Sequence, residues 1–213
     1  MNSVNSVAPS PQVVTVVLNP ALDHTIEVAG LRLGAVNHAL RMQVEAGGKA
    51  INVRRAHAAG AAVALDTSGT PLKIALAAGP QMVKPNRHEL AELVGEPLET
   101  REALVAAARA LLNGPHAPET VIVSLGGDGA LFLTREQALH AHPVKVAVTS
   151  TVGAGDAMVA GLVAARLENL ALVETAQLAT AFSASKLTRL GPHLPPPDQV
   201  RALARQVAVS TID

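Results

Sequence analysis

The sequence predicts an α/β fold: a doubly wound, mainly parallel sheet with helices on both faces. Two observations lead to this prediction. Continuous runs rich in β-branched residues, such as Val13–Leu18 and Thr120–Ser124, are typical of strands that are buried on both faces. These runs alternate along the chain with helix-length segments, and such alternation is typical of sheets that are mainly parallel.

The remaining elements are expected in order along the 213 residues. Further strands are expected at Asp23–Val28, Ala39–Val44, Val63–Asp66, Gln81–Lys84 and Ala130–Thr134, the last forming a hairpin with Thr120–Ser124 across Gly126–Gly129. Helices are expected at Lys49–Ala59, Pro71–Ala78, Arg87–Val94, Arg101–Leu112, Asp156–Leu167, Leu172–Lys186 and Pro197–Val207. Residues 1–12 lack the features of a signal peptide, so we expect a disordered tail before a single domain over 13–213.

Composition limits the class of function. The chain has 17 Lys and Arg against 17 Asp and Glu and no long basic run, so we expect neither a nucleic-acid partner nor an anionic membrane surface. Without cysteine there is no disulfide, thiolate zinc site or thiol nucleophile, which agrees with a cytoplasmic location. No window reaches the roughly 18 apolar residues of a membrane helix, so we expect a soluble protein. Phe132 and Phe182 are the only aromatic residues, so the core must consist of small aliphatic side chains.

The segment TSTVGAGD, residues 149–156, precedes an apolar helix. Glycines at the start of a helix let backbone N–H groups converge on an anion, which the helix dipole also favours. Asp156 would repel that anion unless it takes a proton from a hydroxyl attacking a phosphoryl group. The alternative is an aspartate that only caps the helix, and the residues alone leave both open.

Two further polar clusters follow strands. Glycines in Ser124–Gly129 permit close approach of a flat or phosphorylated ligand, but a tight hairpin uses the same residues. Asn86 and Glu89 fit a helix cap, and they also fit a phosphate site in which Glu89 acts through water on Mg²⁺. Near the start, Asp23 and the Gly48-Lys49 turn offer short polar groups for a polyhydroxylated anion.

The order of the motifs is more specific than any one of them. VLNPALD, AGGKAINV, KPNRHEL, SLGGDGAL and STVGAGDAMVAGL occur in the same order as in the phosphofructokinase-B/ribokinase family of sugar kinases, which the chain resembles. The first two motifs look most like those of the 1-phosphofructokinase branch, a relative of tagatose-6-phosphate kinase. Ala50 stands where the family commonly has glycine.

The resemblance implies a ribokinase-like fold and an ATP- and Mg²⁺-dependent kinase that phosphorylates a ketohexose phosphate, most simply fructose 1-phosphate. It implies that Asp156 is the catalytic base and that Gly153, Ala154 and Gly155 form the anion hole. The implied nucleotide site is Asn86, Ser124, Leu125, Gly126, Gly127, Asp128, Gly129 and Gly155, with Glu89 at the metal and Asp23, Gly48, Lys49 and Asn52 at the sugar. The implied partners are a sugar phosphate, ATP and a second copy of the chain, bound through lid strands at about 23–46.

The resemblance also exposes a gap. The helix at Lys49–Ala59 should lead into further strands and helices, yet it runs straight into the strand ending ALDTSG. Roughly a hundred residues, a small domain's worth, are missing at a junction near Ala62–Ala64. We therefore expect impaired sugar phosphorylation, because a short lid closes poorly. The alternatives are a non-catalytic nucleotide-binding remnant and a deletion product that does not fold stably.

Overall fold

The computed structural model describes residues 22–28, 39–46, 61–189 and 194–212, the first two ranges as backbone strands only. Strands β1 (Leu22–Val28) and β2 (Ala39–Ala46) pair antiparallel in a sheet of their own, with Asp23 opposite Glu45. Both strands fall where lid strands are predicted. The strand expected at Val13–Leu18 and the helix expected at Lys49–Ala59 lie outside the described residues.

The remaining described strands form one six-stranded sheet in the order β3-β4-β5-β6-β7-β8. The strands are β3 (Ala64–Leu65), β4 (Met82–Val83), β5 (Thr120–Ser124), β6 (Ala130–Leu133), β7 (Ala138–Ala141) and β8 (Val209–Thr211). The helices are α2 (Gly69–Leu76), α3 (Arg87–Val94), α4 (Arg101–Leu112), α5 (Ala154–Leu167), α6 (Leu172–Leu187) and α7 (Pro197–Ala204). A single 3₁₀ turn, Gly126–Asp128, links β5 to β6.

The sheet is mixed rather than mainly parallel among the described strands. β3, β4 and β5 run parallel, whereas β5 through β8 pair antiparallel. The reversal begins at the predicted hairpin, because the turn at Gly126–Gly129 sends β6 back along β5. β7 and β8 then extend the antiparallel half; the sequence analysis did not predict them.

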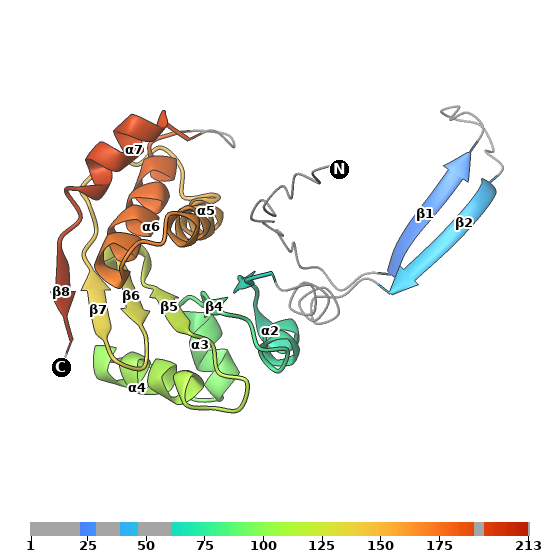
Figure 1. Cartoon of the computed structure of the whole chain (residues 1–213), viewed down its shortest axis with the longest axis horizontal. Coiled ribbons are helices and arrows are strands. Elements are labelled where there is room, and N and C mark those ends of the chain that lie inside the picture. Colours follow the sequence, from blue (N-terminus) through green and yellow to red (C-terminus); the bar gives the residue numbers. More distant parts are fainter. Residues whose placement is uncertain (1–21, 29–38, 47–60, 190–193, 213) are drawn as a thin grey trace, which may run out of the picture.

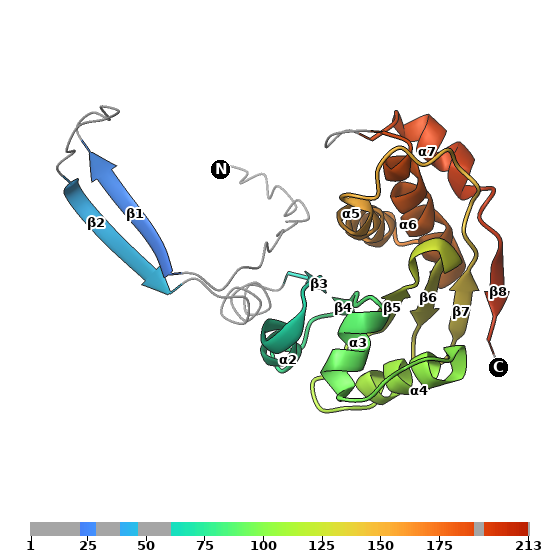
Figure 2. The same ribbon diagram turned by 180° about the vertical axis from the view of Figure 1, so that it is seen from behind.

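Helices cover both faces of the six-stranded sheet, as predicted (Figures 1 and 2). On one face, α2, α3 and α4 pack with side chains such as Leu104 and Val121 in one buried apolar cluster. On the other face, α5, α6 and α7 pack with side chains such as Phe132, Met158 and Val200 in a second cluster. Each cluster is dominated by small aliphatic residues, in line with the composition.

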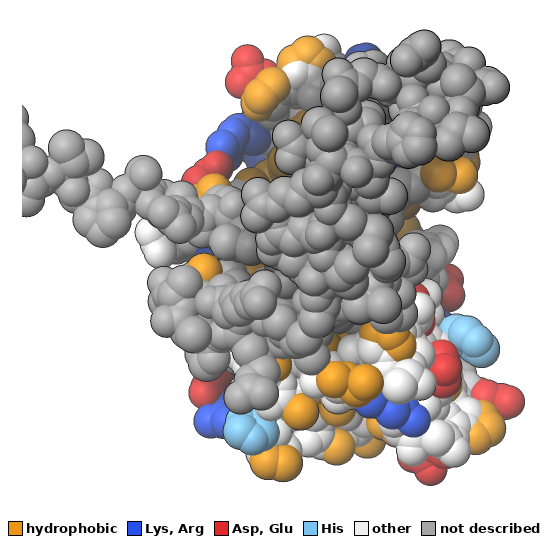
Figure 3. Space-filling model, turned by 90° about the vertical axis from the view of Figure 1, so that its right-hand side faces the viewer, with side chains coloured by type: hydrophobic (Ala, Val, Ile, Leu, Met, Phe, Trp, Pro, Cys, Tyr) orange, Lys and Arg blue, Asp and Glu red, His pale blue; other side chains and the backbone are white. Residues whose placement is uncertain are grey.

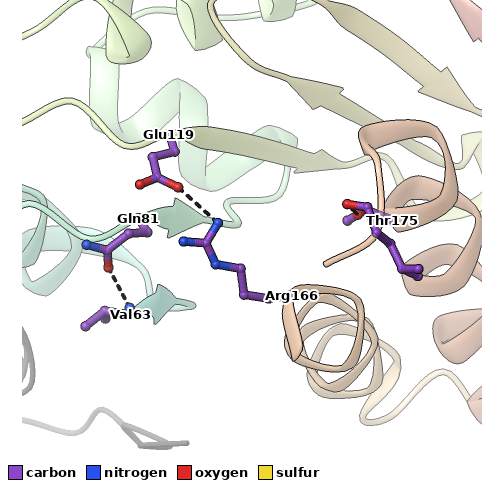
Figure 4. A network of polar contacts seen from close by, with 6 residues as sticks. Val63, Gln81, Glu119, Arg166 and Thr175 are labelled. Carbon is purple, nitrogen blue, oxygen red and sulfur yellow. Dashed lines mark hydrogen bonds and ion pairs between the residues drawn. The ribbon is translucent and has the colours of Figure 1, made fainter. Parts of the chain in front are cut away.

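Two predicted strands are shorter in the structure than expected, although backbone hydrogen bonds continue at their ends. The amide of Val63 donates to the side chain of Gln81 at 2.6 Å, and Val63 O accepts from Gln81 N and Met82 N (Figure 4). At the other end, Lys84 N donates to Leu65 O at 2.9 Å, while the side chains of Asp66 and Lys84 form an ion pair. α2 begins two residues earlier than predicted, at Gly69, whose positive φ of 63° glycine adopts without steric cost.

The α5–α6 pair positions the N-terminal turn of α5. A Cβ atom on Gly161 would lie 2.7 Å from Ala179 Cα and 3.1 Å from Phe182 Cβ, so only glycine permits this approach. The far end of α5 is tied to the sheet by Arg166, whose Nη1 lies 3.2 Å from Glu119 Oε2 just before β5 (Figure 4). α5 thus packs closely against α6 at its middle, while the exposed ion pair at its C-terminal end contributes little.

The surface mixes charges of both signs. On the face shown in Figure 3, the described surface interleaves hydrophobic side chains with Lys, Arg, Asp and Glu. Within the described ranges, none of the helices combines the length and apolar character needed to cross a membrane.

Candidate active site

The carboxyl ends of three parallel strands bring two predicted motif segments, KPNRHEL and SLGGDGAL, together. β3 ends before Asp66, β4 before Lys84 and β5 at Ser124, so these residues share one edge of the sheet. Asn86 forms an isolated parallel bridge with Ser124, and Ser124 N donates to Pro85 O at 3.1 Å. Ligands of α/β sheets bind outside this edge.

Lys84 joins the strand ends to the turn of α5. Its side chain is 6% exposed, and Nζ lies 3.1 Å from Asp66 Oδ2. A Cβ atom on Gly155 would lie 3.5 Å from the same Nζ. A buried, paired ammonium group therefore lies directly beside the second glycine of the turn.

Asn86 and Glu89 form a complete capping box at the start of α3. Asn86 Oδ1 accepts from Glu89 N at 2.9 Å, and Glu89 Oε2 accepts from Asn86 N at 2.8 Å. The helix cap that the sequence predicts as one role for this pair is thus present. Glu89 Oε1 has no hydrogen-bond partner among the described residues, so the cap leaves one carboxylate oxygen available for a second use.

The loop from Ser124 to Gly129 is both a hairpin and an accessible backbone surface. Leu125 N donates to Gly129 O at 2.8 Å, which closes the turn. Nothing lies within 4 Å of a Cβ atom built on Gly126 or Gly127, so the backbone there is open to a ligand. At Gly129, with φ 87°, a Cβ atom would overlap the carbonyl oxygen of Ala141, so glycine is required.

Two side chains hold this loop in place. His140 Nε2 lies 2.8 Å from Asp128 O; since a carbonyl accepts, Nε2 carries the proton. Burial lowers the pKa of His140, and the nearby positive charges of His142 and Arg101 lower it further, against the raising effect of the Asp128 bond. Arg87 Nη2 lies 3.8 Å from Asp128 Oδ2, an exposed pair that contributes little.

The turn Gly153–Asp156, called the glycine turn below, begins α5. Gly153 is its N-cap with φ 80°, a conformation suited to glycine. Asp156 is exposed in the first turn of the helix, and its Oδ2 lies 4.0 Å from the position of a Cβ atom on Gly153. The carboxylate of Asp156 therefore lies close to the N-terminal turn of α5, where helical N–H groups favour an anion.

The predicted sugar-binding residues lie mostly outside the described part of the chain. Asp23 lies in β1, where only the backbone is described, while Gly48, Lys49 and Asn52 fall outside the described residues. Among the described residues, no three His, Asp or Glu side chains group closely enough to hold a metal ion alone.

Sequence reasoning missed three charged residues beside the glycine turn. They are Asp66, Lys84 and Lys186, of which the two lysines are buried. A lysine ending an apolar strand, and another among the buried positions of α6, are the signals that would have pointed to them.

The family model for pfkB family carbohydrate kinases matches residues 54–199. The chain belongs to this family. The match includes the motifs KPNRHEL, SLGGDGAL and STVGAGDAMVAGL, so the family resemblance predicted from the sequence is confirmed.

Similar proteins and solved structures also belong among sugar and sugar-phosphate kinases. The 1-phosphofructokinase of Rhodobacter capsulatus is 50% identical over 153 residues, which are 72% of this chain and 48% of that protein. Phosphofructokinase-2 from Escherichia coli in complex with potassium has a TM-score of 0.69 at 31% identity, covering 74% of this chain and 51% of that chain. Arabidopsis thaliana ribokinase, complexed with ribose and ATP, has a TM-score of 0.65 at 27% identity, covering 74% and 53%. The ribokinase-like α/β fold is confirmed.

The chain spans about half the length of the curated relatives it matches. This fits the shortened domain that the sequence predicts.

Proposed function

We propose that this kinase-family chain transfers a phosphoryl group from ATP to a phosphorylated ketohexose, with fructose 1-phosphate the first substrate to test. One observation carries the proposal: the glycine turn with Asp156 lies beside Lys84, at the sheet edge where Asn86 bridges to Ser124. The 50% identical relative, a 1-phosphofructokinase, supports the choice of sugar. The ATP in the ribokinase structure supports the choice of donor.

The proposed step is an in-line displacement. The substrate's primary hydroxyl oxygen forms a bond to the γ-phosphorus, the bond from that phosphorus to the β,γ-bridging oxygen breaks, and ADP leaves. Asp156 accepts the hydroxyl proton, and the backbone N–H groups of the glycine turn hold the phosphoryl oxygens. Lys84 adds a charge beside Gly155, and Gly126 and Gly127 leave backbone open to the nucleotide.

The donor set fits Mg²⁺ held mainly by phosphates and water. Mg²⁺ in nucleotide sites commonly uses one or two carboxylates and keeps several waters. Glu89 offers one oxygen beyond its capping bond, which suits contact through water. When bound, the ion would neutralise charge on the phosphates; Asn86 and Glu89 would hold its waters.

A second candidate is a nucleotide-binding protein without transfer activity. The observation that favours it is the length of the chain, which spans about half of its relatives. Such a protein would keep the glycine loop and the capping box and would bind ATP without turnover.

The test is release of ADP from ATP and Mg²⁺ with fructose 1-phosphate, tagatose 6-phosphate, fructose 6-phosphate or no sugar. We expect sugar-dependent release, lowered about 10²–10⁴-fold in Asp156→Asn, the usual contribution of a general base. Asp198→Asn is a matched control, since Asp198 is also in the first turn of a helix but outside the site. ATP binding without ADP release under any of these conditions would favour the second candidate. If the protein melts cooperatively but neither binds ATP nor releases ADP, both candidates are excluded.

A further inference from the structure

A second buried lysine lies against the glycine turn. Lys186, near the C-terminal end of α6, is 6% exposed, although lysine is rarely buried without a partner. A Cβ atom on Gly153 would lie 3.2 Å from Lys186 Cε, so the end of this side chain occupies the space that glycine leaves. Lys84 stands in the same relation to Gly155.

Lys186 differs from Lys84 in its partners. Lys84 pairs with a carboxylate, Asp66, whereas Lys186 Nζ donates only to the carbonyl of Arg189, at 3.2 Å. Within the described chain, the other N–H groups of Lys186 have no partner and the side chain forms no ion pair. Burying a cation without an opposite charge is costly, so packing alone is a poor reason for a lysine here.

Backbone bonds fix this lysine relative to the turn. Thr149 N and Ser150 N, just before the turn, donate to Leu187 O at 2.7 and 3.2 Å. Leu187 follows Lys186 directly, so the end of α6 and the approach to the glycine turn form one unit. The backbone beside Lys186 is thus anchored next to the turn, and the bond from Nζ to Arg189 O restrains the ammonium group.

We propose that the restrained positive charge of Lys186 strengthens the binding of the transferred phosphoryl group at the glycine turn. It acts as a positioning residue from the Gly153 side, while Lys84 acts from the Gly155 side. A fixed charge in a partly desolvated site interacts with an anion more strongly than a surface charge does. The inference rests on the proposed kinase function, and the ligand class is a phosphate anion.

The test compares wild-type protein with Lys186→Met, which keeps the side chain's length and removes its charge. We expect kcat to fall about tenfold or more, and the affinity for a non-hydrolysable ATP analogue to fall more than the affinity for ADP. The melting temperature should stay equal or rise, because an apolar residue removes an unpaired buried charge. Lys73→Met, at an exposed lysine in the last turn of α2, is the matched control and should behave as wild type.

A second variant separates charge from hydrogen bonding. Lys186→Ala leaves space for an added cation, so ammonium chloride should restore part of kcat, and potassium chloride should do so if charge alone matters. Unchanged kcat and analogue affinity in Lys186→Met would overturn the inference, as would losses matched by a lower melting temperature. If wild-type protein neither binds the analogue nor turns over, the proposed function fails and this inference with it.

Discussion

One ring nitrogen of His140 bonds to the loop Ser124–Gly129, and the other has no hydrogen-bond partner among the described residues. Nε2 donates to Asp128 O, while the buried Nδ1 has no partner in the described chain. A proton added at Nδ1 would be buried, unpaired and close to His142 and Arg101. The lowered pKa of His140 therefore reflects a neutral ring that braces the loop.

This shift predicts a pH dependence of stability. Because the folded-state pKa of His140 lies below 6.5, the unfolded chain binds more protons as pH falls through 6.5, and the free energy of unfolding decreases. The slope contributed by this group is at most about 1.4 kcal/mol per pH unit, the value for one proton. We expect His140→Gln, which keeps an N–H for Asp128 O without titrating, to flatten urea-denaturation stability between about pH 7 and 5. Equal slopes in the two proteins would contradict this.

At the residue scale, the sequence predicted what depends on neighbours along the chain. The capping box of Asn86 and Glu89 and the glycines of the α5 turn follow from local spacing. The pairing of Lys84 with Asp66 and the contact of Lys186 with Gly153 did not, because each joins elements far apart in sequence.

The contact between α5 and α6 depends on one missing side chain. Gly161→Ala would place a methyl group 2.7 Å from Ala179 Cα, a backbone atom that cannot move aside without shifting α6. Overpacking costs about 1–3 kcal/mol, against a gain of about 1 kcal/mol in helix propensity. We expect a net loss of stability, measured by chemical denaturation. Gly114→Ala, where the new atom meets only ordinary contacts at 3.7 Å, is the control and should lose far less.

At the element scale, helices with clear caps were predicted to the residue and the short outer strands were missed. α4 begins where expected because the Thr100 side chain accepts from Ala103 N at 3.1 Å. β7 and β8 have four and three residues and little alternation, so their existence depends on pairing across the sheet. The mixed direction of the sheet follows from the same pairing.

At the scale of the molecule, the described side chains beyond position 60 form two apolar clusters, one on each face of the six-stranded sheet. We therefore expect a chain lacking residues 1–60 to unfold cooperatively, with a calorimetric enthalpy of roughly 100 kcal/mol for roughly 150 residues near 60 °C. The full chain, scanned beside it, is the control. A broad transition without an enthalpy peak would show that the first 60 residues are needed for the core.

The predicted junction near 62–64 and the homodimer through the lid strands remain predictions. β1 and β2 are present as an antiparallel pair, yet their pairing does not test either one. The position of the missing segment was predicted from the spacing between motifs, and this spacing does not show how the neighbouring strands adjust.

The pairing of β8 has a consequence for the edge of the sheet. Thr211 pairs with Leu139, and Ile212 N donates to Ala138 O at 2.8 Å, so β8 covers one side of β7. All four residues of β7 are buried. If β8 detached, the backbone groups of β7 would be unpaired along that side and could pair with a neighbouring chain. A change that weakens β8 would thus promote aggregation as well as the loss of one short strand.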